Sequence, residues 1–187
     1  KRQGSAGTDG HGDTSAASEV TAALASVSDG VAGLVPDGGS RTTLRSAVAP
    51  RCAGMVPYLS WGRTLRGPGG PVVVGAEVHG AGLGGRALES RRRAMSRCGV
   101  RTRSLPPRVA AAVDGAPGTS FAKVGDTAEL AWRRGDVVVV VDAFSPAAPL
   151  AEVARALDDA LVRALDGRCA TVDAPESAAR RNPSQSD

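Results

Sequence analysis

The chain has 187 residues, 42% of them hydrophobic, which suits one globular domain or two at most. No apolar run is long enough to cross a bilayer. Aromatic side chains make up only 3% of the sequence, too few for a base-stacking platform, so we expect no nucleic-acid partner. The net charge of +4 indicates no particular partner, and three cysteines exclude a zinc ribbon or a disulfide-dense miniprotein.

The two ends of the sequence differ in composition from its middle. Residues 1–18 contain no large apolar side chain. Such a segment buries too little surface to offset the entropy cost of ordering it, which predicts a flexible leader. The last residues lead to the same interpretation. The expected organisation is therefore a leader over residues 1–18, one domain over residues 19–173 and a disordered tail over residues 174–187.

Elements in the first half of the domain follow from apolar spacing and turn residues. Apolar residues at helical spacing predict a first helix over residues 20–34. A short helix over residues 40–48, with Ser40 as its N-cap, is expected next. Two strands over residues 58–66 and 71–79, joined by a turn rich in glycine, predict a hairpin.

The remaining predicted elements, in chain order, are a helix over residues 86–97, strands over 99–105, 108–114, 127–134 and 137–141, and a helix from Ser145 to Gly167. Gly135-Asp136 is what a two-residue hairpin turn requires, so we interpret Arg134-Gly135-Asp136 as a turn and not as a cell-adhesion tripeptide. Five consecutive valines after this turn indicate a strand covered on both faces. Hairpins predominate over strand-helix-strand units. This predicts the α+β class, with about five or six strands in a twisted antiparallel sheet and about four helices packed on it.

Residues 80–85 match the G-x-G-x-x-G pattern of dinucleotide-binding loops. The pattern positions are Gly80, Gly82 and Gly85. A strand is predicted before this loop and a helix after it, and Arg101 or Arg103 stands where such sites place an acidic residue. Arginine there suits the 2′-phosphate of NADP, so an NADP-binding oxidoreductase is the alternative function. It requires the strands on either side of that helix to be parallel neighbours; the more ordinary interpretation is a flexible connection.

Glu77 and His79 lie two positions apart on a predicted strand and therefore share one of its faces. A catalytic pair would need a nucleophile or a metal beside it, and neither G-x-S-x-G nor H-E-x-x-H surrounds these residues. We interpret them as a polar strand edge that faces solvent. No catalytic residue, metal site or cofactor is therefore predicted.

Positive charge concentrates in the middle of the sequence. Residues 41–108 contain 13 Arg against Glu77 and Glu89, a local charge of +11. Four of these arginines crowd the predicted helix over residues 86–97: Arg91, Arg92, Arg93 and Arg97. They form either a solvated face, in which some pair with acidic residues of the second half (Asp142, Asp158, Asp159), or an anion-binding surface for phosphate-rich polymers or lipid head groups.

The three cysteines are Cys52, Cys98 and Cys169, and their spacings do not resemble those of zinc ligands. Each lies at the end of a predicted helix, where a staple between elements would be placed. An odd count allows at most one internal disulfide. Spacing alone leaves open whether two of them pair or all three remain buried thiols.

Four segments of the sequence together resemble a known family. They are Val31–Pro36, Arg86–Cys98, Val124–Ala128 and Arg134–Val141. From about residue 31 to residue 169 the pattern is similar to the small secreted lipoproteins of actinobacteria. It is also similar to the related extracellular sensor domains of actinobacterial receptor Ser/Thr kinases, a family of unassigned function.

The resemblance implies an extracytoplasmic α+β domain, secreted or anchored in the cell envelope, that touches the membrane only through an upstream anchor. It also implies a disulfide, and relatives often carry a cysteine at the position of Gly33, which accounts for the odd count. Among the three pairs we favour Cys98–Cys169, because both residues end predicted helices. The family brings no catalytic residues. The expected function is therefore non-catalytic, sensor-like binding of an envelope ligand or protein, with anionic polymers as one class of ligand.

Overall fold

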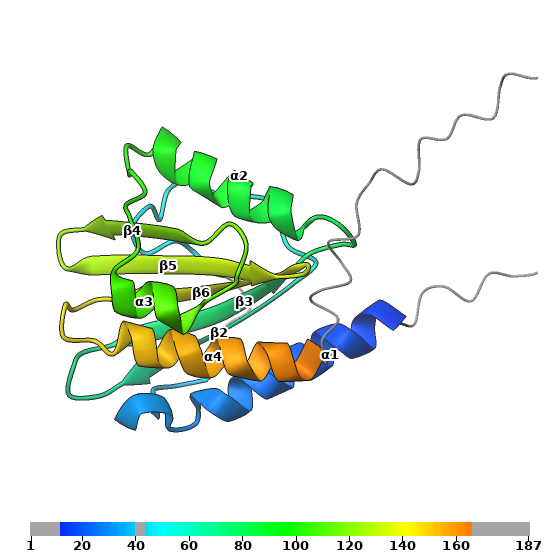
Figure 1. Cartoon of the computed structure of the whole chain (residues 1–187), viewed down its shortest axis with the longest axis horizontal. Coiled ribbons are helices and arrows are strands. Elements are labelled where there is room, and N and C mark those ends of the chain that lie inside the picture. Colours follow the sequence, from blue (N-terminus) through cyan, green and yellow to red (C-terminus); the bar gives the residue numbers. More distant parts are fainter. Residues whose placement is uncertain (1–11, 40–43, 166–187) are drawn as a thin grey trace, which may run out of the picture.

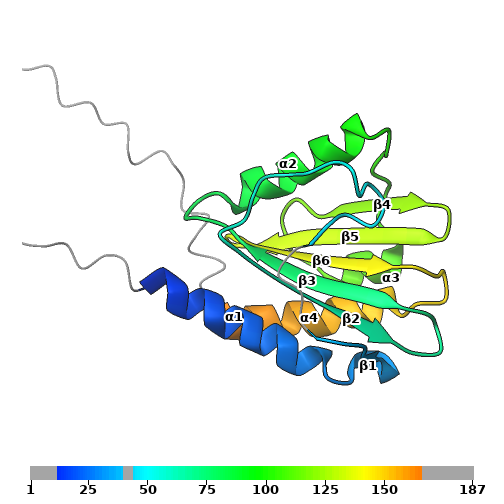
Figure 2. The same ribbon diagram turned by 180° about the vertical axis from the view of Figure 1, so that it is seen from behind.

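A sheet of six strands is the centre of the structure, a computed structural model that describes residues 12–39 and 44–165. The strands are β1 (Val35–Pro36), β2 (Leu59–Arg66), β3 (Val72–Val78), β4 (Ser120–Val124), β5 (Thr127–Arg134) and β6 (Val137–Ala143). Their order is β1-β2-β3-β6-β5-β4, and every neighbouring pair is antiparallel (Figure 1; β1 is labelled in Figure 2). The predicted α+β class with an antiparallel sheet is confirmed.

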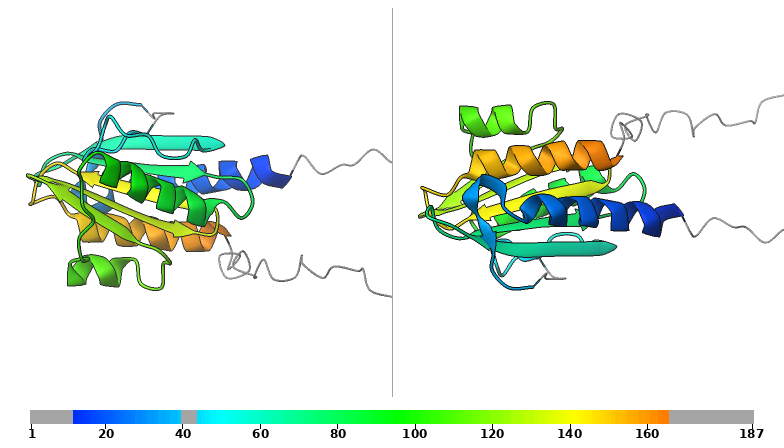
Figure 3. Two further views of the ribbon diagram at one scale, coloured as in Figure 1. Left: turned by 90° about the horizontal axis from the view of Figure 1, so that it is seen from above. Right: turned by 90° about the horizontal axis from the view of Figure 1, so that it is seen from below.

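Helices cover both faces of this sheet (Figure 3). They are α1 (Gly12–Ser28), α2 (Gly84–Arg97), α3 (Pro107–Ala112) and α4 (Leu150–Leu165), with a short 3-10 helix, η1, at Val31–Gly33. On one face, α1 and α3 both pack against α4, whereas α2 lies on the opposite face over β5 and β6. Within the described ranges, no helix combines the length and the apolar character that a membrane span needs.

The valines of β6 are buried on both sides of the sheet, as their run in the sequence predicts. Val137, Val139 and Val141 belong to the main core, which α1, α3 and α4 cover. Val138 and Val140 belong to a smaller cluster under α2. Successive side chains of a strand point to opposite faces, so a continuous apolar run is needed where both faces are covered.

The first helix begins and ends earlier than its apolar spacing predicts. α1 already includes residues 12–18, so this part of the expected flexible leader is helical. The helix stops at Ser28, and Gly30 then adopts a φ of +129°, which glycine reaches without the steric cost that a side chain adds. The turn at Gly30 separates α1 from η1, so the helix does not continue to Leu34. The first eleven residues and the predicted tail lie outside the described residues.

The predicted second helix is wrong over residues 44–48, which are irregular, and its first residues lie outside the described part. Leu44 packs over Gly62 and Gly75, which are partners on β2 and β3. A Cβ atom on these glycines would lie 2.3 and 2.4 Å from atoms of the Leu44 side chain. The glycine pair therefore forms a hollow for the leucine, and this tertiary contact outweighs the local helical pattern.

The predicted strands at 99–105 and 108–114 are also wrong. The first contributes only an isolated bridge between Thr102 and Ala122. The second is replaced by α3, because Pro107 has the fixed φ of a first helical position and the following alanines favour a helix. The sequence interpretation missed two strands: β4, which pairs with β5, and the two-residue β1, which pairs with β2.

The last helix begins at Leu150 and not at Ser145. Ser145 Oγ accepts a hydrogen bond from the Ala147 N–H at 3.2 Å in a local turn. The N–H of Val153 donates to the Pro149 carbonyl at 3.0 Å. Because a proline disfavours helical geometry in the residue before it, Pro149 postpones the helix until after the turn.

Candidate ligand-binding cleft

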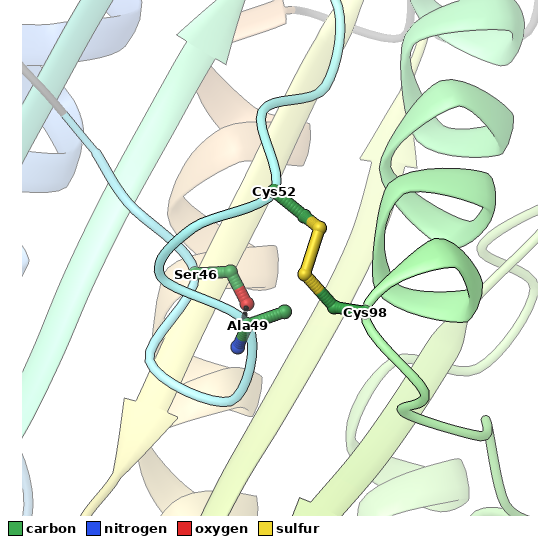
Figure 4. Close-up of a disulfide and its surroundings, with 4 residues drawn as sticks. All are labelled: Ser46, Ala49, Cys52 and Cys98. Atoms are coloured by element: carbon green, nitrogen blue, oxygen red, sulfur yellow. Dashed lines mark hydrogen bonds between the residues drawn. A yellow bond between two sulfur atoms is a disulfide. The ribbon is translucent and has the colours of Figure 1, made fainter.

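Residues 44–58, which we call the strap, run along the face of the sheet that α2 covers (Figure 2). Val48 of the strap packs in one apolar cluster with Met95 of α2. A disulfide joins Cys52 to Cys98, directly after α2, with the two Cα atoms 6.2 Å apart (Figure 4). The strap is therefore held to the helix by packing and by a covalent bond.

A cleft of about 600 Å³ lies between the strap, α2 and strands β2 and β3, a volume typical of small-ligand sites. Its apolar lining includes Leu44, Met55, Pro57, Ala87 and Met95. Its buried polar lining consists of Ser46, Glu77 and Arg91. Two exposed arginines of the strap, Arg45 and Arg51, complete the charged lining and form its rim.

Arg91 is the centre of a charged network beneath the cleft. Its Nε donates to Glu129 Oε1 at 2.7 Å, and its Nη1 donates to Glu77 Oε1 at 3.2 Å. Ser46 Oγ donates to the other oxygen of Glu129 at 2.5 Å. Nη2 of Arg91 is buried and has no hydrogen-bond partner among the described residues. The network ties the strap, helix and sheet together, and within it Arg91 is buried and bonded to carboxylates and not part of an open arginine surface.

Asp142 adds a third carboxylate to this network, directly opposite Glu129 on the neighbouring strand. The two residues are cross-strand partners on β5 and β6, and both are buried. Burial and the negative charge of Glu129 raise the pKa of Asp142 well above its ordinary value, and Arg91 offsets only part of this effect. Burial lowers the pKa of Arg91, but the carboxylates of Glu129 and Glu77 outweigh burial and raise it overall. The network thus holds a charged guanidinium beside a carboxyl group that favours its protonated form.

Asp142→Asn is expected to stabilise the protein at neutral pH and to flatten the pH dependence of its stability. The raised pKa means that the folded state keeps a proton that the unfolded state releases. Stability therefore falls as the pH rises from 3.8 through the folded-state pKa, by at most about 1.4 kcal/mol per pH unit. Urea unfolding at a series of pH values measures this slope. Asp159→Asn, at an exposed position of α4, is the control, and equal slopes in the two variants would contradict the prediction.

Glu77 and His79 share a face, as predicted, but both are buried, so the expected solvent-facing polar edge is wrong. The physical reason is that α2 and the strap cover this face of the sheet. His79 Nε2 lies 3.5 Å from Glu77 Oε2, and neither ring nitrogen of His79 has a hydrogen bond within the described chain. Over the same residues, no group of three or more His, Cys, Asp or Glu side chains is placed to hold a metal ion.

The other three arginines of the predicted anion surface do not form one site. Arg92 and Arg93 both pair with Glu89, at 3.7 and 3.0 Å. They line a hollow of about 630 Å³ together with Arg101, which follows α2. Arg97 is exposed but lies outside the lining of this hollow. The structure therefore brings two of the four arginines together with a third from outside the predicted set.

The Gly-rich loop before α2 binds a carboxylate of the protein itself. The N–H groups of Gly82 and Gly84 donate to the Asp136 side chain at 3.0 and 2.9 Å. Amides at a helix N-terminus are what a dinucleotide site offers to a pyrophosphate, and here they are used internally. β3 is antiparallel to both of its neighbours, β2 and β6, and residues 99–105 form no strand beside it. The described residues therefore lack the parallel strand pair that NADP binding at this loop requires.

Asp136 belongs to the Arg-Gly-Asp sequence, which forms the predicted turn between β5 and β6. Gly135 adopts a φ of +56° in this turn. Arg134 pairs with Asp158 of α4 at 2.7 Å, so the charged residues on both sides of the glycine are bound within the fold. The sequence serves a hairpin turn that contacts α2 and α4.

Gly84→Ala is expected to lower the free energy of unfolding by about 3 kcal/mol, the upper part of the range for overpacking. An added Cβ would lie 2.3 Å from the Gly135 carbonyl oxygen and 2.7 Å from the Asp136 Cα, and both are backbone atoms. Gly85→Ala is the matched control, since its Cβ would meet only the Arg133 side chain, at 3.7 Å or more. There alanine should stabilise the helix by about 0.5–1 kcal/mol. Urea unfolding of both variants measures the difference, and similar effects at the two positions would contradict the close approach.

The structure pairs Cys52 with Cys98, so the favoured pair of Cys98 with Cys169 is wrong. Cys169 itself lies outside the described residues. The physical reason is a turn in the strap. Ser46 Oγ accepts a hydrogen bond from the Ala49 N–H at 3.0 Å, and the Cys52 N–H donates to the Ala49 carbonyl at 3.0 Å. This turn directs Cys52 toward the end of α2 (Figure 4).

Ser46 and Glu129 are the network residues that the sequence interpretation missed, whereas Asp142 was expected as one of several acidic partners of the arginines. The two carboxylates carried a signal: Glu129 stands among apolar residues of a strand, and Asp142 directly follows the five valines. A carboxylate in such a setting needs a partner, because burying an unpaired charge is costly. To identify that partner as Arg91, one must also know that α2 covers the face of β5 and β6 on which these two carboxylates lie. Ser46 lies in irregular chain and carried no such signal.

The cleft can hold a ligand through apolar contacts with its walls and through hydrogen bonds with Glu77 and Arg91. Its basic rim favours a negatively charged ligand. Comparison of the chain with protein-family models, with curated proteins and with solved structures gave no match in any of the three.

Proposed function

We propose that this protein is a non-catalytic ligand-binding domain and that the cleft under the strap is its binding site. The observation that carries the proposal is Arg91, whose Nη2 is buried beneath an apolar cleft without a hydrogen-bond partner among the described residues. A buried donor left unpaired costs about 1–3 kcal/mol. This nitrogen is closed to solvent, so a ligand acceptor that enters the cleft reaches it, and recovers that free energy, only when the side chains that cover it shift on binding.

The cleft is also organised before a ligand arrives. The disulfide fixes the strap to the end of α2, and the bonds of Arg91 to Glu129 and Glu77 fix the orientation of its guanidinium. A site whose side chains are already immobilised loses little conformational entropy on binding. These features support a binding role for the cleft.

We further propose that the domain works outside the cytoplasm, as the resemblance to actinobacterial envelope lipoproteins and sensor domains implies. The disulfide is consistent with this location, because such bonds persist mainly in oxidising compartments. Alkylation of the protein in intact cells, followed by a non-reducing peptide map, tests the location. A free Cys52 thiol in cells would overturn it.

The binding role is tested by titrating the oxidised full chain with a library of small fragments and recording the backbone amide NMR spectrum. We expect fragments that shift signals of the residues lining the cleft. Gly54→Phe should abolish these shifts, because Gly54 lines the cleft and its Cβ would make only ordinary contacts of 3.5 Å with Arg91. Gly39→Phe is the matched control, since nothing lies within 4 Å of its Cβ position. Binding that persists in Gly54→Phe, or the absence of any fragment at the cleft, would overturn the proposal.

A further inference from the structure

The polar lining of the cleft leaves one donor and one acceptor unused. The donor is Nη2 of Arg91, which has no partner in the described part of the chain. The acceptor is Oε2 of Glu77, which lies 3.5 Å from His79 Nε2 without a hydrogen bond between them. The other carboxylate oxygen of Glu77 already accepts from Arg91 at 3.2 Å. The two unused groups therefore belong to side chains in direct contact with each other.

This pair selects for a neutral ligand group that both donates and accepts. A carboxylate placed there would meet the negative charge of Glu77, and an ammonium group would meet the positive charge of Arg91. The backbone of an extended peptide avoids both penalties. The N–H and C=O of one residue point to the same side, as they do in a hydrogen-bonded pair of an antiparallel sheet. Once the side chains that cover Nη2 shift, one peptide residue can donate to Glu77 and accept from Arg91 at the same time.

The rim adds a preference for negative charge. The charged lining consists of three arginines and one glutamate, a local net charge of +2. Arg45 and Arg51 are exposed, and within the described residues neither has an ion pair. Acidic groups on either side of the engaged peptide residue would meet these arginines. Electrostatic complementarity of this kind favours the matching ligand and speeds its association.

The apolar lining accounts for the rest of the ligand. The walls formed by Met55, Pro57 and Met95 suit one apolar side chain, and the cleft volume of about 600 Å³ limits the ligand to a short segment. Val56, which also lines the cleft, and Tyr58, which follows Pro57 in the strap, are 85% and 69% exposed and extend the apolar surface. We propose that the cleft binds a short acidic peptide in an extended conformation. This inference rests on the proposed ligand-binding function.

The test uses the oxidised full chain at low salt and tripeptides with blocked ends. Two of them, Asp-Leu-Asp and Lys-Leu-Lys, differ in charge. The others are analogues of Asp-Leu-Asp in which one amide N–H group at a time is replaced by an ester oxygen. Calorimetry should show the acidic peptide binding at least about tenfold more tightly than the basic one. One ester analogue should lose about tenfold in affinity, because it lacks the N–H that donates to the Glu77 carboxylate.

Charge reversal at the rim provides the matched variants. Arg45→Glu/Arg51→Glu should reverse the preference between the acidic and basic peptides. Arg97→Glu/Arg103→Glu makes the same change in charge at exposed positions outside the cleft and should leave the preference unchanged. If fragments bind the cleft but the acidic and basic peptides bind equally, or every ester analogue binds like its parent, the peptide inference is overturned and the binding function stands. If neither fragments nor peptides shift the cleft signals, both are overturned.

Discussion

Arg91→Met is expected to lower the free energy of unfolding by about 3–5 kcal/mol, the loss typical of removing one partner from a buried ion pair. Methionine keeps the length and helix propensity of the side chain but removes the guanidinium. Glu129, which is 1% exposed, then loses a charged hydrogen bond of 2.7 Å, and Glu77 loses one of 3.2 Å. Two buried carboxylates would remain without a counter-charge, and urea unfolding measures the cost.

A second substitution separates this electrostatic cost from lost packing. In the Arg91→Met background, Glu129→Gln should recover at least about 1 kcal/mol, because it removes one uncompensated charge and keeps a hydrogen-bond acceptor for Ser46. Arg93→Met on the same helix is the control. Its side chain is 72% exposed and pairs with Glu89 at the surface, so its effect should stay within about 0.5 kcal/mol. Equal effects of the two arginine substitutions would contradict the buried network.

Elements whose signal is local could be predicted from the sequence. The hairpin of β5 and β6 depends on Gly135-Asp136 and on the valine run, all of which lie within a few residues of each other. The hairpin of β2 and β3 is similarly local. By contrast, the position of Leu44 depends on Gly62 and Gly75, which are far away in the chain. A helical pattern of apolar residues cannot reveal that its best packing partner is a hollow in a sheet.

The residues of the candidate site likewise include some features that the sequence indicates and others that depend on distant parts of the chain. Glu77, Arg91 and Cys52 were singled out from the sequence. Cys52 forms a disulfide, as one of the three candidates, whereas Glu77 and Arg91 have roles that the structure changes. Residue type alone could not separate Arg91 from the arginines beside it. Spacing contained the answer, because Arg91 follows Leu88 by three positions and precedes Met95 by four, which places it on the apolar side of the helix. Spacing could not show that two carboxylates of the sheet, those of Glu77 and Glu129, compensate the charge of the buried Arg91.

The double variant Cys52→Ser/Cys98→Ser is expected to lower the free energy of unfolding by about 4 kcal/mol. The disulfide closes a loop with a sequence separation of 46, and the chain-entropy relation gives about 4 kcal/mol for a loop of this length. Most of this effect arises in the unfolded chain, which gains conformational freedom when the loop is opened. Urea unfolding of the oxidised protein and of the variant gives the difference, and adding a reductant to the native protein should reproduce it.

The same variant also tests what the disulfide does for the cleft, because Cys52 belongs to the strap that forms one of its walls. Any ligand that binds the cleft should bind the variant more weakly even under conditions where it is fully folded, since the strap must then be ordered on binding. Cys169→Ser is the control: it leaves the Cys52–Cys98 pair intact and should change stability by less than about 0.5 kcal/mol. A large loss in Cys169→Ser with none in Cys52→Ser would instead assign the bond to Cys98 and Cys169. The strap would then be held only by its packing and by Ser46, and the cleft would lose its covalent support.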